Sequence, residues 1–315
     1  MIRKHLFNII FTVIFLGLFS LIINLYYDDV SRALYENDIF PADKGFDILE
    51  CQNWRNEMRQ FHVSDEDKAK QVTVLMYHRV IEEDQIDDIH LETNGDLVST
   101  VMLKSEFDMQ MQLLKNEGFT TLTLKELEAF IEGKIDVPKH SIVLTFDDGF
   151  KDNALEVAPI LREHGFTGVS FVITGVVNLY DAKYEPGKYQ YLSVEDIQNT
   201  CDVFEFESHT YNFHKRMDDH TAYLIGKPDE LVRKDLETSI INLDGNTQAF
   251  ASPYGAFDEN NIQLFQKLGF NMAFTVVPET VRPGTDIYQI PRKEVYPHET
   301  IIDFKEKIGL QDGDT

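Results

Sequence analysis

The chain has 315 residues, 43% of them hydrophobic, and its 23 phenylalanines and 13 tyrosines are enough for one large core. Its 54 acidic side chains outnumber its 29 basic ones, and the formal net charge is −25. That balance argues against nucleic-acid binding, because neutralising phosphates requires a basic face.

Residues 6–26 are the first predicted element, a largely apolar run of about 20 residues that is long enough to cross a bilayer as a helix. The basic pair Arg3–Lys4 precedes the run and the acidic pair Asp28–Asp29 follows it, so the positive-inside rule places the rest of the chain outside the cytoplasm. The alternative, a cleaved signal peptide, is less favoured because no small-x-small cleavage site follows the run. We therefore expect a cytoplasmic stub over residues 1–5 and a single-pass cell-membrane anchor over 6–26.

Residues 27–70 are charged and only weakly periodic. They fit either a stalk or a small helical layer that packs against the large domain expected over residues 71–315. Cys51 lies in this segment, and the second cysteine is Cys201. An extracytoplasmic location allows a disulfide between them, but two cysteines alone do not establish one.

Strand-like and helix-like patterns alternate through the predicted domain. The strand-like runs lie near residues 72–77, 141–146, 168–173, 203–206, 247–251 and 272–277. The helical patterns lie near residues 104–117, 124–132, 152–164, 229–242 and 258–268. Such alternation predicts a parallel α/β architecture, and we expect a distorted (β/α) barrel.

Two adjacent carboxylates, Asp147 and Asp148, follow the apolar run 141–144 and precede Gly149. Adjacent residues that leave a strand point in different directions, so the two carboxylates are suited to different tasks. One can ligate a metal while the other acts as a base, as metal-assisted hydrolysis requires. The alternative for an isolated Asp-Asp-Gly is a helix cap at a strand-to-helix turn.

Two histidines, His209 and His214, follow the apolar stretch 203–206. Histidines five residues apart lie about 140° apart on a regular helix, so both can reach one ion only from a turn or loop. With Asp148 they make a three-ligand site with room for water, the pattern of a catalytic zinc-type centre. Lone histidines are more often solvated or hydrogen-bonded, but the strand-end carboxylates favour the metal interpretation here.

Further candidates also follow strand-like runs. The turn Ser252–Gly255 can aim the Tyr254 N–H at a developing oxyanion, and His78 ends the run at 72–77. The carboxyl ends of parallel strands form the face where barrel enzymes place their chemistry. The tyrosine-rich segment 180–191 fits either contact with sugar faces or ordinary packing.

With these motifs the chain resembles the carbohydrate esterase family 4 (NodB-like) polysaccharide deacetylases over roughly residues 71–300. The segment Thr145–Gly149 matches that family's Thr-Phe-Asp-Asp-Gly motif at every position. The histidine spacing and the segment Tyr77–Val80 are most similar to the deacetylases of biofilm poly-N-acetylglucosamine and polysaccharide intercellular adhesin. The resemblance implies the following roles: Asp147 as general base, Asp148, His209 and His214 as metal ligands, and the Tyr254 amide in an oxyanion hole.

The chain departs from the family pattern at two motifs. The late Leu-x-His motif, which supplies the general acid, has no good copy after residue 255. His78 resembles that motif moved to the front by circular permutation of a closed barrel, and we expect it to be the acid. The arginine that pairs with the catalytic aspartate is missing before Pro253, and we expect Arg292 to replace it and keep Asp147 ionised, against the alternative of a surface arginine.

The resemblance implies metal-dependent N-deacetylation of an extracellular N-acetylhexosamine polysaccharide, such as a poly-N-acetylglucosamine-like exopolysaccharide in a biofilm matrix or on the cell surface. The ligand set suits Zn²⁺, although Co²⁺, Ni²⁺ or Fe²⁺ can fill the same site. An exopolysaccharide synthase complex is a candidate partner. Two alternatives stay open: the same chemistry on peptidoglycan, a Pel-like polymer or chitin oligomers, and a non-catalytic glycan-binding or export module.

Overall fold

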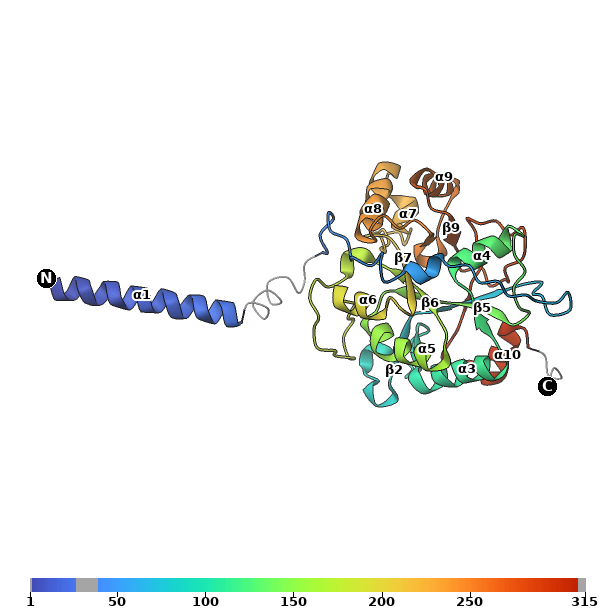
Figure 1. Cartoon of the computed structure of the whole chain (residues 1–315), viewed down its shortest axis with the longest axis horizontal. Coiled ribbons are helices and arrows are strands. Elements are labelled where there is room, and N and C mark those ends of the chain that lie inside the picture. Colours follow the sequence, from blue (N-terminus) through green and yellow to red (C-terminus); the bar gives the residue numbers. More distant parts are fainter. Residues whose placement is uncertain (1, 27–38, 311–315) are drawn as a thin grey trace. The chain divides into compact units, whose positions relative to one another are not determined.

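The N-terminal apolar run forms one helix, α1 (Ile2–Leu25), in the computed structural model, which describes residues 2–26 and 39–310 (Figure 1). Residues His5–Ile23 of this helix have a mean hydropathy of 2.6 and are long and apolar enough to cross a bilayer. A signal sequence passes the same test, so the helix agrees with either interpretation of this segment.

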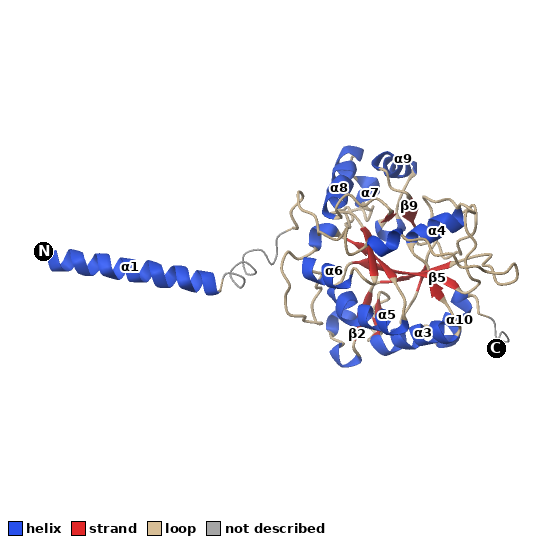
Figure 2. Ribbon diagram, viewed as in Figure 1, coloured by secondary structure: helices blue, strands red, loops and turns tan. Residues whose placement is uncertain are grey.

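The second compact unit begins at Phe40 and is built around a parallel sheet, with eight strands in the described residues. The strands lie in the order β10 (Lys293–Glu294), β1 (Thr73–Tyr77), β5 (Ser141–Asp148), β6 (Gly168–Val172), β7 (Phe204–Ser208), β8 (Ala249–Ala251) and β9 (Met272–Phe274), and β4 (Thr120–Thr121) pairs with β5. Within this unit the strands are central and helices surround them (Figure 2). The prediction of an α/β fold with a parallel, barrel-like sheet is confirmed.

A segment just before β10 brings the two edges of the sheet together. The Ile290 N–H donates to the Ala273 carbonyl at 2.9 Å, and the Ile290 carbonyl accepts from the Thr275 N–H at 2.8 Å, so this residue pairs with β9. Three residues later, β10 begins and pairs with β1 at the opposite edge. The sheet therefore curls around, with Arg292 at its seam, and the first strand of the unit lies beside the last.

The helices around the sheet begin and end as follows: α3 (Lys104–Asn116), α4 (Leu124–Ile131), α5 (Ala158–His164), α6 (Val194–Thr200), α7 (Tyr223–Gly226), α8 (Asp229–Asn242), α9 (Glu259–Leu268) and α10 (Ile301–Ile308). Short 3₁₀ turns are η1 (Asn53–Asn56), η2 (Glu83–Gln85), η3 (Asp88–His90), η5 (Thr174–Val176) and η6 (Pro253–Gly255). The predictions did not include α6, α7, α10 or the separate parallel pair β2 (Arg79–Ile81) and β3 (Val101–Leu103).

The helix predicted near 152–164 is present but widens at its start into a π-turn, η4 (Asn153–Val157), before α5 begins. The two residues at this point make tertiary hydrogen bonds. Asp152 Oδ1 accepts from the Val80 N–H at 3.1 Å, and the Asn153 amide donates to the His78 carbonyl at 2.8 Å. π-turns of this kind are frequent at functional sites, and this one connects the end of β5 to the end of β1.

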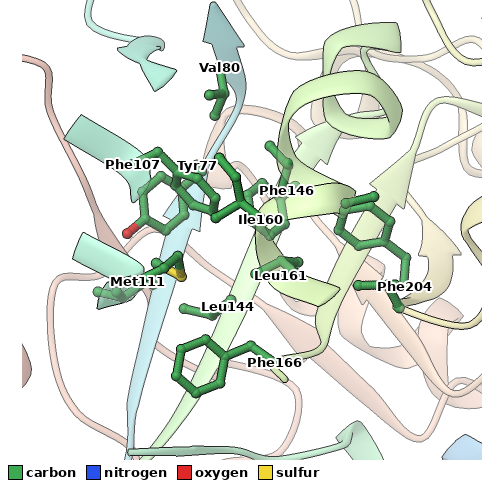
Figure 3. Close-up of a cluster of buried hydrophobic side chains, with 14 of the residues drawn as sticks. Tyr77, Val80, Phe107, Met111, Leu144, Phe146, Ile160, Leu161, Phe166 and Phe204 are labelled. Carbon is green, nitrogen blue, oxygen red and sulfur yellow. The ribbon is translucent and has the colours of Figure 1, made fainter. Parts of the chain in front are cut away.

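Alternate residues of each strand pack on opposite sides of the sheet. On the outer side, Tyr77 and Phe146 pack against Phe107 of α3, with ring centroids 5.3 and 5.9 Å apart (Figure 3). Val74 and Val143, from the same two strands, belong to a separate cluster that β6, β8 and β9 complete. That second cluster fills the inside of the barrel below the candidate site.

Residues 40–70, which belong to the predicted stalk or layer, are part of the compact unit. Phe40 and Phe46 are buried in the outer core, and their rings lie 4.9 Å apart. This part of the segment therefore packs against the barrel, whereas residues 27–38 lie outside the described residues.

A disulfide and an ion pair also attach the layer formed by residues 40–70 to the rest of the compact unit. Cys51 and Cys201, whose pairing the sequence left open, form a disulfide with their Cα atoms 5.8 Å apart. The Arg55 guanidinium lies 2.9 Å from the fully buried carboxylate of Glu207 on β7. A buried carboxylate is costly without such a partner, so the layer contributes to the stability of the barrel.

Candidate active site

The carboxyl ends of the strands meet at one rim of the barrel, because the strands are parallel. The sequence-predicted candidates lie there: His78 after β1, Asp147 and Asp148 at the end of β5, His209 and His214 after β7, Tyr254 after β8, and Arg292 at the seam before β10. Residues from five separate segments thus converge on one place.

Asp148, His209 and His214 form a compact cluster of possible metal ligands. One ligand atom from each lies within 4.8 Å of those of the other two. Asp148 Oδ1 is 3.5 Å from His209 Nε2 and 3.3 Å from His214 Nε2. Histidines five residues apart reach one point because Thr210 between them has a positive φ of 77°, which turns the chain out of the strand.

The protonation state of His209 and the buried carboxylate oxygen of Asp148 fit the binding of a divalent cation. The His209 Nδ1–H donates to the Ala251 carbonyl at 2.7 Å, which leaves the Nε2 lone pair facing Asp148. Burial lowers the pKa of His209 to about 4, so its ring is neutral, as ligation requires. Asp148 Oδ1 is buried and has no hydrogen-bond partner among the residues that the structure describes, which is costly unless a cation faces it.

The backbone at the end of β5 is specialised for this geometry. Asp148 has φ of 73°, a left-handed conformation that is uncommon outside glycine, and it aims the carboxylate away from the strand. Gly149 follows with φ of 75°, and a Cβ there would lie 2.9 Å from the Val172 side chain. The glycine of the motif is therefore needed both for its dihedral angle and for close contact with β6.

A residue that the sequence did not predict fixes the loop between the two histidines. The Asp235 carboxylate on α8 accepts from the Tyr211 N–H and the Asn212 N–H, each at 2.8 Å. These two hydrogen bonds hold Tyr211 and Asn212, which lie between the two histidines. No local pattern could have identified Asp235, since it lies 24 residues from Tyr211 in the chain.

Asp147 is paired with Arg292 inside the barrel. The guanidinium donates to both carboxylate oxygens, at 2.6 and 2.8 Å, and it also donates to the Thr275 carbonyl at 3.0 Å. Arg292 is fully buried and lies over the Phe171 ring. The sequence alternative of a surface arginine is therefore wrong, and two parallel hydrogen bonds fix the orientation of the Asp147 carboxylate.

The charge state of Asp147 follows from this pairing. Burial would raise the pKa of its carboxyl group, but the positive charge of Arg292, with smaller effects from His209 and His78, lowers that pKa to about 2. Asp147 is therefore a carboxylate at any ordinary pH. It keeps its negative charge in a buried position, which suits a proton acceptor.

His78 and Asp147 directly follow Tyr77 and Phe146, which are paired residues of the neighbouring strands β1 and β5. The charge of His78 is one of the smaller effects that lower the pKa of Asp147. The backbone around His78 is held by two fully buried residues, Asp152 directly before the π-turn and Asn153 at its start. Asp152 also pairs with Arg79, whose Nε is 2.9 Å from Oδ2. No role was predicted for Asp152 or Asn153, which lie three and four residues after Gly149.

Tyr254 lies beside the candidate metal ligands. Its φ is 60°, its ring is 4.6 Å from the His214 ring, and its hydroxyl donates to the His214 carbonyl at 3.3 Å. The Arg216 guanidinium lies over the same ring, with its central carbon 4.1 Å from the ring centroid. The turn is therefore next to the cluster, while the role of the Tyr254 backbone N–H stays a prediction.

Comparisons with known proteins agree with this geometry. The polysaccharide deacetylase family model matches residues 134–273, which include the Asp-Asp-Gly motif, both histidines and Tyr254. The poly-β-1,6-N-acetyl-D-glucosamine N-deacetylase of Staphylococcus epidermidis is 29% identical over 230 residues, which are 69% of this chain and 76% of that protein. The enzyme of the same name from Staphylococcus aureus is 25% identical over 234 residues.

Solved structures are similar as well. IcaB from Ammonifex degensii matches with a TM-score of 0.61 and 25% identity, over 73% of this chain and 94% of that chain. The Streptococcus pyogenes deacetylase PplD, solved in complex with acetate, matches with a TM-score of 0.63 over 76% of this chain and 98% of that chain. At 22% identity the latter supports the fold alone.

Proposed function

Because the polysaccharide deacetylase family model matches residues 134–273 and the similar staphylococcal proteins are N-deacetylases by name, we propose that this chain is a hydrolase of amide bonds that removes acetyl groups from an extracellular N-acetylhexosamine polymer with the help of a divalent metal. The names of the staphylococcal relatives support a poly-N-acetylglucosamine-like exopolysaccharide of a biofilm or cell surface as that polymer. The observation that carries the proposal is the convergence of an Asp-His-His cluster and an ionised, arginine-paired aspartate on one rim.

Asp148, His209 and His214 would hold the metal. A divalent ion bound by such ligands acts as a Lewis acid toward a carbonyl oxygen and lowers the pKa of water, and the ligand set suits Zn²⁺, with Co²⁺, Ni²⁺ or Fe²⁺ as alternatives. The hydrogen bond from His209 to the Ala251 carbonyl orients one ligand ring, and the contacts of Asp235 hold the approach to the other.

The remaining residues would move protons and stabilise charge. Asp147, kept ionised and aimed by Arg292, takes the proton of the water that attacks the acetamide carbon. The Tyr254 N–H donates to the oxyanion of the tetrahedral intermediate. His78 gives a proton to the leaving amine nitrogen as the C–N bond breaks. The products are acetate and a glucosamine-type residue that remains in its polymer.

Metal removal tests this function. Treatment of the full chain, purified in detergent, with a chelator should reduce acetate release from N-acetylglucosamine polymers at least tenfold, and added Zn²⁺ should restore it. The matched variant His209→Ala should stay inactive after Zn²⁺ is returned, because it lacks one ligand. Acetate release that survives both chelation and His209→Ala would contradict metal dependence.

We also propose that α1 anchors the protein in the cell membrane, with the compact unit outside the cytoplasm and residues 71–315 as the deacetylase domain behind a packed juxtamembrane layer. The disulfide between Cys51 and Cys201 supports this location, since such bonds persist in oxidising compartments. That side of the membrane would also place the enzyme beside a synthase complex that exports the polymer, which we propose as its partner.

The disulfide provides a measurement of this location. In protein taken from its native cells without reductant, Cys51 and Cys201 should not react with a thiol reagent, and both should react after reduction and denaturation. The variant Cys51→Ser leaves Cys201 without its partner and should be labelled before reduction. Full labelling of the unreduced wild-type protein in denaturant would place the unit in a reducing compartment.

A further inference from the structure

The loop between η5 and α6 presents an aromatic ring that the proposed chemistry does not use. Tyr189 is 59% exposed, although its ring lies 6.2 Å from that of Phe150 and 5.4 Å from the guanidinium carbon of Arg79. Phe150 is only two residues beyond the candidate ligand Asp148. Tyr189 therefore combines contacts to two ordered side chains with a largely exposed ring that a ligand can reach.

The loop that carries Tyr189 is fastened directly to the turn of the metal site. The Leu192 N–H donates to the Gly149 carbonyl, and the Lys151 N–H donates to the Gln190 carbonyl, both at 2.9 Å. The buried Lys151 ammonium also donates to Asp196 at 2.6 Å. The backbone contacts, one and three residues after Tyr189, hold this part of the loop against the end of β5.

The Arg79 side chain that contacts the Tyr189 ring is also held in place. Arg79 is 2% exposed, and its Nε donates to the fully buried Asp152 at 2.9 Å. Its guanidinium also lies 5.2 Å from the Phe150 ring. Because the Arg79 guanidinium is held by these contacts, the Tyr189 ring packs against side chains that are already ordered. Little conformational entropy is then lost when a ligand stacks on it.

Tyr191 belongs to the same group of side chains. Its ring stacks on Phe150 with centroids 5.2 Å apart, and the two residues also form a β-bridge. The Tyr189 ring contacts the same Phe150 ring and is the more exposed of the two tyrosines. Phe150 therefore connects both tyrosines to the end of β5.

We propose that Tyr189 forms a sugar-binding subsite beside the catalytic centre and stacks on the pyranose ring next to the one that loses its acetyl group. This inference rests on the proposed function, since it takes the ligand to be the same polymer. A pyranose presents an apolar C–H face that complements an aromatic ring, and the hydroxyl edge of tyrosine suits the wet rim of such a site. The subsite would make the enzyme prefer chains over short fragments.

Binding of N-acetylglucosamine oligomers to the full chain in detergent tests the subsite without depending on catalysis. Tyr189→Ala should weaken the binding of a pentamer about fivefold and leave the binding of the N-acetylglucosamine monosaccharide unchanged, and Tyr189→Phe should match the wild type. In turnover, the same loss should appear in KM for the pentamer with kcat unchanged.

Two outcomes would overturn the subsite: equal pentamer affinity of Tyr189→Ala and wild type, or an equal loss for pentamer and monosaccharide, which would indicate a damaged loop. The exposed residue Met109 on α3 supplies a matched control, and Met109→Ala should bind both ligands as the wild type does. A wild type that binds the oligomers in the expected pattern but releases no acetate would contradict the proposed function while retaining the subsite.

Discussion

Asp147→Asn should lower the rate of acetate release about a thousandfold while the protein keeps its metal. Asparagine has nearly the same shape as aspartate but cannot take a proton from water. The three candidate ligands belong to other side chains, so metal content should not change. The measurement is the initial rate of acetate release per metal-loaded protein, with metal content determined by elemental analysis.

The neighbouring substitution Asp148→Asn provides the matched control. It changes the same functional group one residue along the strand, but it should reduce metal affinity as well as the rate, since it removes a charged ligand. The two adjacent carboxylates should therefore separate into one that affects catalysis alone and one that affects both. If Asp147→Asn keeps a tenth or more of the wild-type rate, Asp147 is not the general base.

Much of this separation could be predicted from the sequence because it depends on local geometry. Consecutive residues at the end of a strand diverge, and the structure extends this divergence by giving Asp148 a positive φ. Asp147 continues the inward alternation of β5 and reaches Arg292, whereas Asp148 turns out toward the histidines. The same logic holds for the strand patterns, whose apolar runs correspond to β1, β5, β6, β7, β8 and β9.

The missed elements are short or are defined by distant partners. The helix α6 has only seven residues and is started by a capping box in which Ser193 accepts from the Asp196 N–H, a signal too small to stand out beside periodicity. At the π-turn in the predicted helix near 152–164, Asp152 accepts from the Val80 N–H and Asn153 donates to the His78 carbonyl, and both partners lie far earlier in the chain. The role of Asp235 likewise depends on a distant partner, since its carboxylate accepts from the Tyr211 N–H, 24 residues away in the chain.

Arg292→Ala should reduce turnover about a hundredfold with metal content unchanged, and it should shift the pH dependence of the reaction. In the wild type, Arg292 offsets the effect of burial and lowers the pKa of Asp147 to about 2, so the base stays ionised as pH falls. Without the guanidinium, burial dominates and raises that pKa. Asp147 is then protonated at higher pH, and the acid limb of the kcat/KM profile should move upward in pH.

Arg292→Lys separates the charge from the two-point hydrogen bonding. Lysine keeps a positive charge near Asp147 but cannot donate to both oxygens in one plane, so the acid limb should stay near its wild-type position while kcat still falls. Arg292→Ala also leaves a buried carboxylate unpaired, which costs about 3–5 kcal/mol of stability, so folding should be verified by circular dichroism before rates are compared. A folded Arg292→Ala variant with a wild-type rate and pH profile would show that Asp147 needs no partner, and the seam of the barrel would then have only a structural role.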